Sequence, residues 1–259
     1  HWHYYDTVKG GDWLVDQDAA KLLAEQAPAT VIALEHAGVA FSRTDDGHIA
    51  QRRFGGHTKD FGKEPVRRAA YAADRIGHQI LFSLWQQCVA EGVEFAEEWY
   101  VTDLVVSEDH GKVEGVVAFD THKGETHAIH ARNVLMATGG AGRIYRVTTN
   151  AVICDGVGYD LALTTGVASL SNMEAIQFHP TGIFPAGILV TEGCRGDGGL
   201  LRDVDGYRFM PDVEPEKKEL ASRDVVSRRM EERIAMGKGV KTKYGEHLWL
   251  DITLLGEHH

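Results

Sequence analysis

The sequence predicts a mixed fold in which an α/β part is followed by an α+β part. Three observations predict it: apolar residues recur at helical spacing in several segments, short β-branched runs alternate with turns, and a long stretch before the C-terminal helix is extended and Gly-rich. The 43% hydrophobic and 25% charged residues are typical of a globular protein. A length of 259 residues fits one large domain or two smaller ones.

Charge and composition exclude several classes of function. The 38 acidic and 27 basic side chains give a net charge of −11, which argues against nucleic-acid binding. No apolar run approaches the ~18 residues of a membrane helix, so no direct membrane span is expected. The three cysteines lack CxxC spacing and read as free thiols, and the 14 histidines are scattered at spacings that fit no tetrahedral site, so no metal is expected.

The first third of the chain predicts helices around one irregular loop. Apolar spacing over residues 12–38 indicates a helical stretch that Pro28 divides in two. Residues 39–63 are rich in Gly, Asp, Arg and His and predict a loop with short extended pieces. Residues 65–91 predict a long apolar helix, buried against a sheet and ended by Gly92.

The remainder predicts a meander, then loops and two further helices. Strands are expected at 98–106, 112–119 and 125–131, with a hairpin turn at 108–112, and they lead into a fourth strand at 133–138. The other expected elements, in order, are a helix at 155–166, an extended stretch at 170–211, a helix at 222–236 with Ser222 as N-cap, and a strand at 247–252.

Two Gly-rich segments are candidate ligand contacts. In NVLMATGGAGRIY (133–145) a hydrophobic strand runs into glycines, which let a ligand approach the backbone and leave amides exposed to anionic groups. The segment is not a full GxGxxG fingerprint, so a simple tight turn stays open as the alternative. In TNAVICDGVGYDLAL (149–163) a turn opens a helix and could bring Asp155 near a ribose or ring edge, or could be an ordinary helix start.

A third region collects polar residues suited to a small dicarboxylate. His179, Thr191, Glu192, Arg195 and Arg223 lie in segments rich in Gly and Pro. A guanidinium grips a carboxylate with two parallel hydrogen bonds, and His and Thr can complete the contacts. Each residue alone also fits a surface charge or pair, but the set together favours a binding site.

Blocks across the whole chain resemble the flavoprotein subunit of succinate dehydrogenase and fumarate reductase. These blocks are RRFGGHTKDFG (52–62), AADRIGH (72–78), ATGGAGRIY (137–145), QFHPTG (177–182), TEGCRGDGG (191–199) and ASRDVVSR (221–228). The stretch 155–180 is most similar to anaerobe-type quinol:fumarate reductases. The resemblance implies part of a glutathione-reductase-like FAD-binding domain with an antiparallel meander over residues 1–175, lacking its N-terminal GxGxxG unit. The start of a substrate-capping domain would follow over 176–259.

The resemblance also implies roles for named residues. Arg223 matches the family's proton-shuttle arginine, and Glu192 and Arg195 match the relay that reprotonates it. Substrate contacts are implied for His179, Thr191 and Phe54, and FAD contacts for Ala137, Thr138, Gly139, Gly140 and Asp155.

The resemblance further implies partners and a setting. The chain is expected to be an internal piece, inactive alone, of a protein whose FAD is attached to a histidine upstream of His1. An iron–sulfur subunit and a membrane quinone-binding anchor would hold it at the cytoplasmic face of a bacterial inner membrane. Two alternatives stay open. One is an L-aspartate oxidase-like flavoenzyme, which shares HPT and RFMPD blocks but which TEGCRGDGG argues against. The other is a catalytically incompetent piece that only binds partners.

Overall fold

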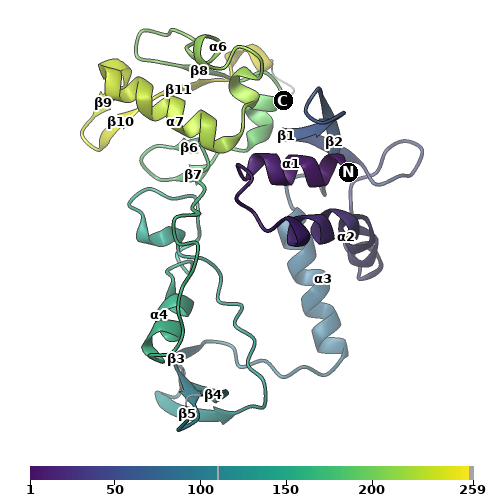
Figure 1. Ribbon diagram of the computed structural model, residues 1–259, viewed down its shortest axis with the longest axis vertical. Helices are drawn as coiled ribbons and strands as arrows, with labels where there is room; N and C mark the ends of the chain where they lie inside the picture. The colour runs from purple at the N-terminus through teal and green to yellow at the C-terminus, as the bar shows by residue number, and fades with distance from the viewer. Residues whose placement is uncertain (110, 257–259) are drawn as a thin grey trace. The chain divides into compact units, whose positions relative to one another are not determined.

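The chain folds into two compact units. The structure is a computed structural model that describes residues 1–109 and 111–256. One unit comprises residues 1–93, 179–181 and the chain from 190 onward, and the other comprises 94–178 and 182–189 (Figure 1). None of the helices in these described ranges is both long enough and apolar enough to cross a membrane. The predicted division at residue 175 stays a prediction.

Two helices open the first unit, α1 (Trp2–Gly10) and α2 (Gln17–His36). The Asp16 carboxylate caps α2 by accepting hydrogen bonds from the backbone N–H groups of Asp18 and Ala19, each at 3.0 Å. The predicted break at Pro28 is wrong, because α2 runs through it. Proline removes only one backbone donor, and the cap together with packing against α1 keeps the helix whole. Helix α1 itself was not predicted.

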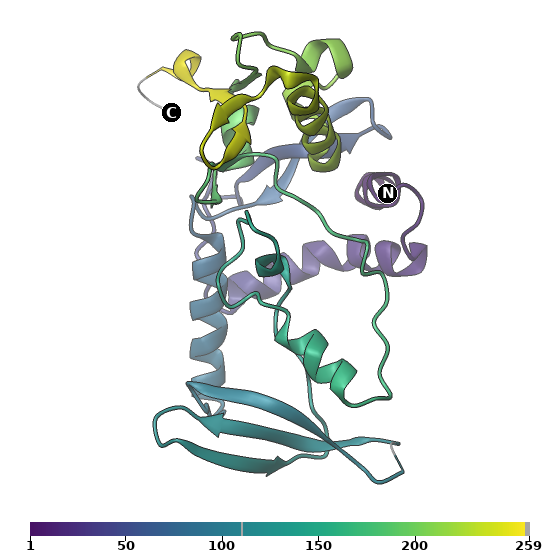
Figure 2. The ribbon, with the colours of Figure 1, turned by 90° about the vertical axis from the view of Figure 1, so that its left-hand side faces the viewer.

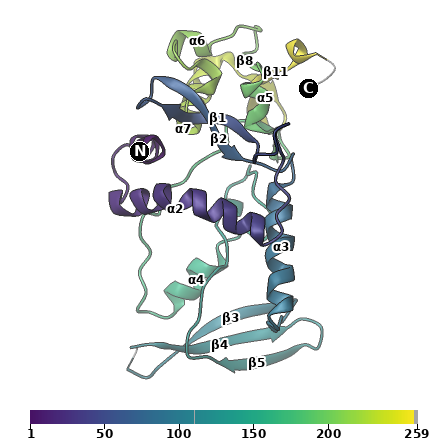
Figure 3. The ribbon, with the colours of Figure 1, turned by 90° about the vertical axis from the view of Figure 1, so that its right-hand side faces the viewer.

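A β-hairpin covers residues 51–70, where a loop and the start of a helix were predicted. Strand β1 (Gln51–Lys59) pairs antiparallel with β2 (Glu64–Ala70), so the extended pieces predicted within 39–63 include one strand of nine residues (Figure 3). The predicted helix at 65–91 is wrong over residues 65–75, since α3 spans only Ile76–Ala90. Arg68 in β2 forms an ion pair of 2.6 Å with Asp6 of α1, a tertiary contact that overrides the helical propensity of the alanines.

Helix α3 also differs from its prediction in burial. Within this chain it presents its large apolar side chains to solvent, namely Leu81, Phe82, Leu84, Trp85 and Val89. The sequence pattern identified the helix but not which of its faces this chain covers.

The C-terminal part of the first unit is built on a small core. Leu201, Phe209, Met210, Ala221 and Val226 are buried together. The elements of this part of the chain are, in order, α5 (Glu192–Gly196), β8 (Leu200–Arg202), α6 (Met210–Val213), η2 (Lys218–Leu220), α7 (Arg223–Arg233), η3 (Ile234–Lys238), β9 (Val240–Thr242), β10 (Gly245–His247), β11 (Trp249–Asp251) and η4 (Thr253–Leu255). The predicted helix from Ser222 and the last strand are confirmed, whereas 170–211 contains short helices and is not wholly extended.

The second unit contains the predicted meander. Strands β3 (Trp99–Val106), β4 (Val113–Asp120) and β5 (Glu125–His130) pair in that order, all antiparallel (Figure 2). The Asp109 carboxylate accepts from the Gly111 N–H at 3.0 Å in the turn at 108–112, whose central His110 lies outside the described residues. The remaining elements are η1 (Gly142–Ile144), α4 (Val157–Thr164), β6 (Gly182–Ile183) and β7 (Ile188–Leu189).

The predicted fourth strand at 133–138 is wrong. These residues have no regular secondary structure, and the side chain of Leu135 is 91% exposed. A strand requires a hydrogen-bonded neighbour, and no strand of the described chain pairs with this segment. The meander is therefore a free-standing three-stranded sheet in this chain.

Candidate active site and flavin-binding segment

A buried carboxylate joins two elements of the first unit. Glu192, the first residue of α5, is only 5% exposed. Its Oε1 accepts a hydrogen bond of 2.8 Å from the backbone N–H of Gly55 in β1. Its Oε2 accepts one of 3.0 Å from Nε of Arg223, the first residue of α7. The carboxylate thus fixes the Arg223 guanidinium relative to β1.

Gly55 is a position where backbone and carboxylate meet closely. A Cβ atom built there would lie 2.5 Å from Oε1 of Glu192 and 3.4 Å from the carbonyl oxygens of Leu220 and Ala221. Only a residue without a side chain allows this hydrogen bond at its observed length. Gly55 was not predicted as a site residue, although the glycine pair after Phe54 was the available signal.

Arg195 lies behind this pair and is almost wholly buried. It is 2% exposed, and its Nη1 donates a hydrogen bond of 2.5 Å to the carbonyl oxygen of Glu219. Its Nε and Nη2 are buried without a partner among the described residues. Burial lowers the pKa of Arg195; Glu192 opposes the shift, and Arg223 adds to it.

A second carboxylate, also missed from the sequence, completes the cluster. Glu219 is buried and receives both a 2.8 Å hydrogen bond from Nε and a 2.7 Å hydrogen bond from Nη2 of Arg208. Burial alone would raise the pKa of Glu219, but the Arg208 fork and backbone N–H groups outweigh it and lower that pKa. The sequence offered no signal, because Glu and Arg eleven residues apart in a polar stretch look like surface charges.

The predicted substrate contacts occupy the same unit. His179 is half-buried, and its Nδ1 lies 2.9 Å from the carbonyl oxygen of Thr181. Burial lowers the pKa of His179, and the positive charges of Arg223 and Arg195 lower it further. Thr191 caps α5, where its Oγ1 accepts a 3.3 Å hydrogen bond from the Gly193 N–H. These contacts fix the orientation of both side chains.

Phe54 lies in β1, next to Gly55. Its ring centroid is 4.8 Å from the Arg52 guanidinium and 5.8 Å from the His57 ring. Phe54, His57 and Glu192 all line one pocket of about 290 Å³. The structure thus brings Phe54, Glu192 and Arg223 together through β1, α5 and α7.

The predicted flavin contacts lie in the second unit. Ala137 to Gly140 are irregular and mostly exposed, and their backbone N–H groups bond to no residue of the described chain. A Cβ at Gly139 or Gly140 would meet nothing within 4 Å, and Gly139 has a φ of +77°. Exposed amides beside open space suit a bulky phosphate-bearing group, so these residues fit FAD.

The neighbouring Asp155 organises the helix that follows this segment. Its Oδ1 accepts a 3.0 Å hydrogen bond from the Val157 N–H at the start of α4. Thr138 packs so closely on Gly158 of α4 that any side chain there would collide with its hydroxyl. The segment is therefore held on α4 without using its own amides.

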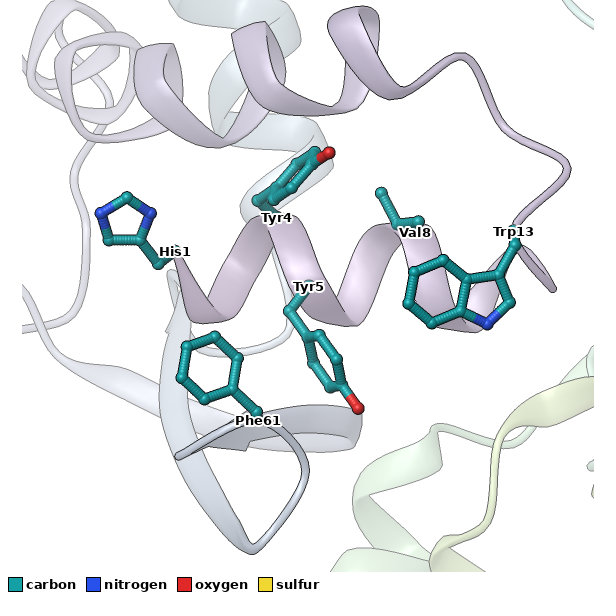
Figure 4. Close-up of a pocket in the computed structure, with 6 residues that line it drawn as sticks. All are labelled: His1, Tyr4, Tyr5, Val8, Trp13 and Phe61. Atoms are coloured by element: carbon teal, nitrogen blue, oxygen red, sulfur yellow. The ribbon is translucent and has the colours of Figure 1, made fainter.

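A second cavity is not suited to this chemistry. It measures about 250 Å³ and is lined by His1, Tyr4, Tyr5, Val8, Trp13 and Phe61 (Figure 4). The Tyr5 ring meets Phe61 edge to face at 5.4 Å. This mostly aromatic cavity has no arginine or lysine in its lining to bind a dicarboxylate. Within the described ranges no cluster of His, Cys, Asp or Glu could hold a metal ion.

Comparison with known proteins identifies the family. The model of the family described as FAD binding domain matches residues 1–259. The chain belongs to this family.

The relatives sharpen that assignment. The chain is 46% identical over 272 residues to the fumarate reductase flavoprotein subunit of Helicobacter pylori, covering 99% of this chain and 38% of the relative. It is 48% identical over 255 residues to the succinate dehydrogenase flavoprotein subunit of Rickettsia bellii, covering 98% and 42%. The chain thus spans about two fifths of the length of these relatives.

Solved structures agree with these relatives. E. coli quinol fumarate reductase FrdA matches with a TM-score of 0.89 and 37% identity, covering 99% of this chain and 44% of that one. Mycobacterium smegmatis Sdh1 matches with a TM-score of 0.75 and 37% identity, covering 98% and 42%. The predicted fold class and the resemblance to these flavoprotein subunits are confirmed.

Proposed function

We propose that the full-length protein interconverts succinate and fumarate with FAD as its cofactor. The observation that carries the proposal is the Glu192 carboxylate held between the Gly55 N–H and the Arg223 guanidinium. This arrangement presents an oriented cation and a buried proton acceptor side by side. The similarity of the chain to fumarate reductase and succinate dehydrogenase flavoprotein subunits supports the same reaction.

The proposed roles are those that the family resemblance implies, and the hydrogen bonds that join Arg223, Glu192 and Gly55 support them. Arg223 holds one charge of the dianionic substrate and gives a proton to a carbon of fumarate. Free guanidinium is a weak acid with a pKa above about 12, but a carbanionic carbon is a much stronger base. Glu192 and Arg195 return a proton to Arg223. His179 and Thr191 hold a substrate carboxylate, and the Phe54 ring lies against the carbon chain.

The cofactor is proposed to contact Ala137, Thr138, Gly139, Gly140 and Asp155. When bound, FAD supplies two-electron hydride exchange with the substrate carbon. Attachment of FAD to a histidine outside residues 1–259 belongs to the same proposal, as do an iron–sulfur subunit, a quinone-binding membrane anchor and a position at the cytoplasmic face of a bacterial inner membrane.

Steady-state kinetics of the full-length complex test this function. We expect succinate-dependent dye reduction and fumarate-dependent oxidation of a reduced dye. Activity with L-aspartate alone would overturn the proposal, and flavin-free protein without either activity would favour a role in partner binding only.

Two arginine variants in α7 distinguish a catalytic role of Arg223 from a general effect of losing one positive charge. Arg223→Gln should abolish turnover while the visible flavin spectrum stays normal. Arg228→Gln is the matched control, because Arg228 forms only an exposed 2.8 Å ion pair with Asp224 in the same helix. Equal losses in both variants would contradict the role assigned to Arg223.

A further inference from the structure

The buried relay needs a source of protons that its own residues do not provide. Arg195 is 2% exposed, so bulk water does not reach its guanidinium. Its Nη1 is engaged by the Glu219 carbonyl oxygen. Glu192 is 5% exposed, yet it lines the 290 Å³ pocket together with Phe54 and His57.

This pocket has the properties of a proton entry. Its volume of about 290 Å³ holds several water molecules, at roughly 30 Å³ each. Charged side chains of both signs line it and would hydrate it, namely Arg53, Lys63, Glu64, Glu216 and Lys217. It includes Gly55, whose N–H donates to the Glu192 carboxylate, so the pocket lies against the relay.

His57 is the titratable side chain of this pocket with the ordinary pKa nearest neutrality. It lies two residues after Gly55 in β1, and its Nδ1 is buried without a partner in the described part of the chain. Burial lowers the pKa of His57, as do the charges of Arg68 and His3, while Asp6 and Glu192 oppose the shift. A lowered pKa favours the neutral ring, so His57 readily gives up a proton once it has taken one.

We propose that protons reach Glu192 through this pocket, carried by the His57 imidazole. The inference rests on the proposed function. Solvent protonates one ring nitrogen of His57, and the other releases a proton through water to the Glu192 carboxylate. Glu192 passes that proton to Arg223, which has given its own to the substrate carbon. His57 returns to its neutral form and no electrons move.

His57 acts through Glu192, so it is a positioning and relay residue. His57→Ala in the full-length complex should lower kcat for fumarate reduction at least tenfold at neutral pH, with KM nearly unchanged. Added imidazole should restore kcat, whereas 1,2,4-triazole, a ring of similar size but much weaker basicity, should not. His48→Ala is the control, since His48 is exposed and pairs only with Asp46 at 3.0 Å.

A second variant tests the pocket itself. Gly196 lines it, and a Cβ there would meet nothing within 4 Å, so Gly196→Leu adds bulk to the pocket without a collision at the backbone. It should lower kcat and raise the solvent isotope effect, whereas Gly77→Leu in α3, also unobstructed at Cβ, should not.

The outcomes separate the inference from the function. Unchanged kcat in both pocket variants, or equal rescue by imidazole and triazole, would overturn the proton entry while leaving succinate–fumarate interconversion intact. A wild-type complex without either activity would overturn the proposed function and, with it, the proton entry.

Discussion

A single methyl group at Gly55 tests the geometry of the site without replacing any charged residue. In Gly55→Ala the new Cβ would lie 2.5 Å from Oε1 of Glu192, whereas ordinary contacts begin at 3.4 Å. The carboxylate must therefore move by about 0.9 Å, the difference between these distances. Arg223 is bonded to the same carboxylate at 3.0 Å and must move with it. A misplacement of about 1 Å can cost ~100-fold in rate, so we expect kcat to fall by roughly that factor.

The assay is fumarate reduction by the full-length complex, with thermal unfolding and flavin content measured in parallel. Overpacking costs about 1–3 kcal/mol, so the variant should still fold. Gly77→Ala is the matched control, because a Cβ at Gly77 meets nothing within 4 Å. Adding Glu192→Asp to Gly55→Ala shortens the side chain that carries the carboxylate. The double variant should therefore recover part of the lost unfolding free energy, so that the two effects are not additive. Normal kcat in Gly55→Ala would refute the idea that this hydrogen bond positions Arg223.

Three further predictions concern charges of the same unit. Asp203 is fully buried and accepts a 3.0 Å hydrogen bond from Nε of Arg233, so Asp203→Asn should destabilise the protein by about 3 kcal/mol in urea unfolding. Because hydrogen bonds lower the pKa of Asp203 despite its burial, wild-type stability should decline as the pH falls below about 4, and less so in the variant. Arg208→Lys keeps the charge but loses the fork on Glu219, which should cost about 1 kcal/mol by the same measurement. The pKa of His179 lies below its usual value in the free protein, and a bound carboxylate would raise it. Dicarboxylate affinity, measured by calorimetry, should therefore rise as the pH falls from the pKa of His179 in the bound protein to its pKa in the free protein. Binding in this pH range should take up protons. Affinity that does not vary with pH would remove His179 from the site.

Local sequence patterns predicted the elements that are stabilised mainly by residues close to them in the sequence. The meander was predictable because its three strands pair with their sequence neighbours through short turns. Helix α7 was predictable from Ser222, although the Ser222 side chain makes no capping hydrogen bond. The failures were segments decided by distant residues: β2 is held by Asp6, fifty-eight or more residues before it, and 133–138 has no strand partner in this chain.

The site residues likewise fall into those that the sequence could predict and those that it could not. Glu192 and Arg223 were identifiable because their blocks are similar to a known family, and the structure joins them at 3.0 Å. Gly55 was not identified, because its importance lies in a backbone N–H, a group that every residue except proline possesses. Glu219 was not identified, because its carboxylate and its partner Arg208 look like surface charges in the sequence. A sequence shows which side chains are available, but which backbone groups meet them depends on the fold.

The charge balance of the cluster explains why an acidic chain can bind an anion. The cluster holds three guanidiniums, those of Arg195, Arg208 and Arg223, and two carboxylates, those of Glu192 and Glu219, whose formal charges sum to +1. Arg208 and Arg223 donate to the carboxylates, and Arg195 donates to the carbonyl oxygen of Glu219. Each carboxylate is buried, which strengthens its pairing, yet the Arg223 side chain remains 39% exposed. The accessible end of the cluster is therefore the Arg223 guanidinium, the group proposed to hold the substrate. Protonation of His179 would add a second positive charge to match the second carboxylate of a dianion. The net −11 is spread over the whole chain and is largely screened beyond ~8 Å at physiological salt, so the local excess decides which ligand binds.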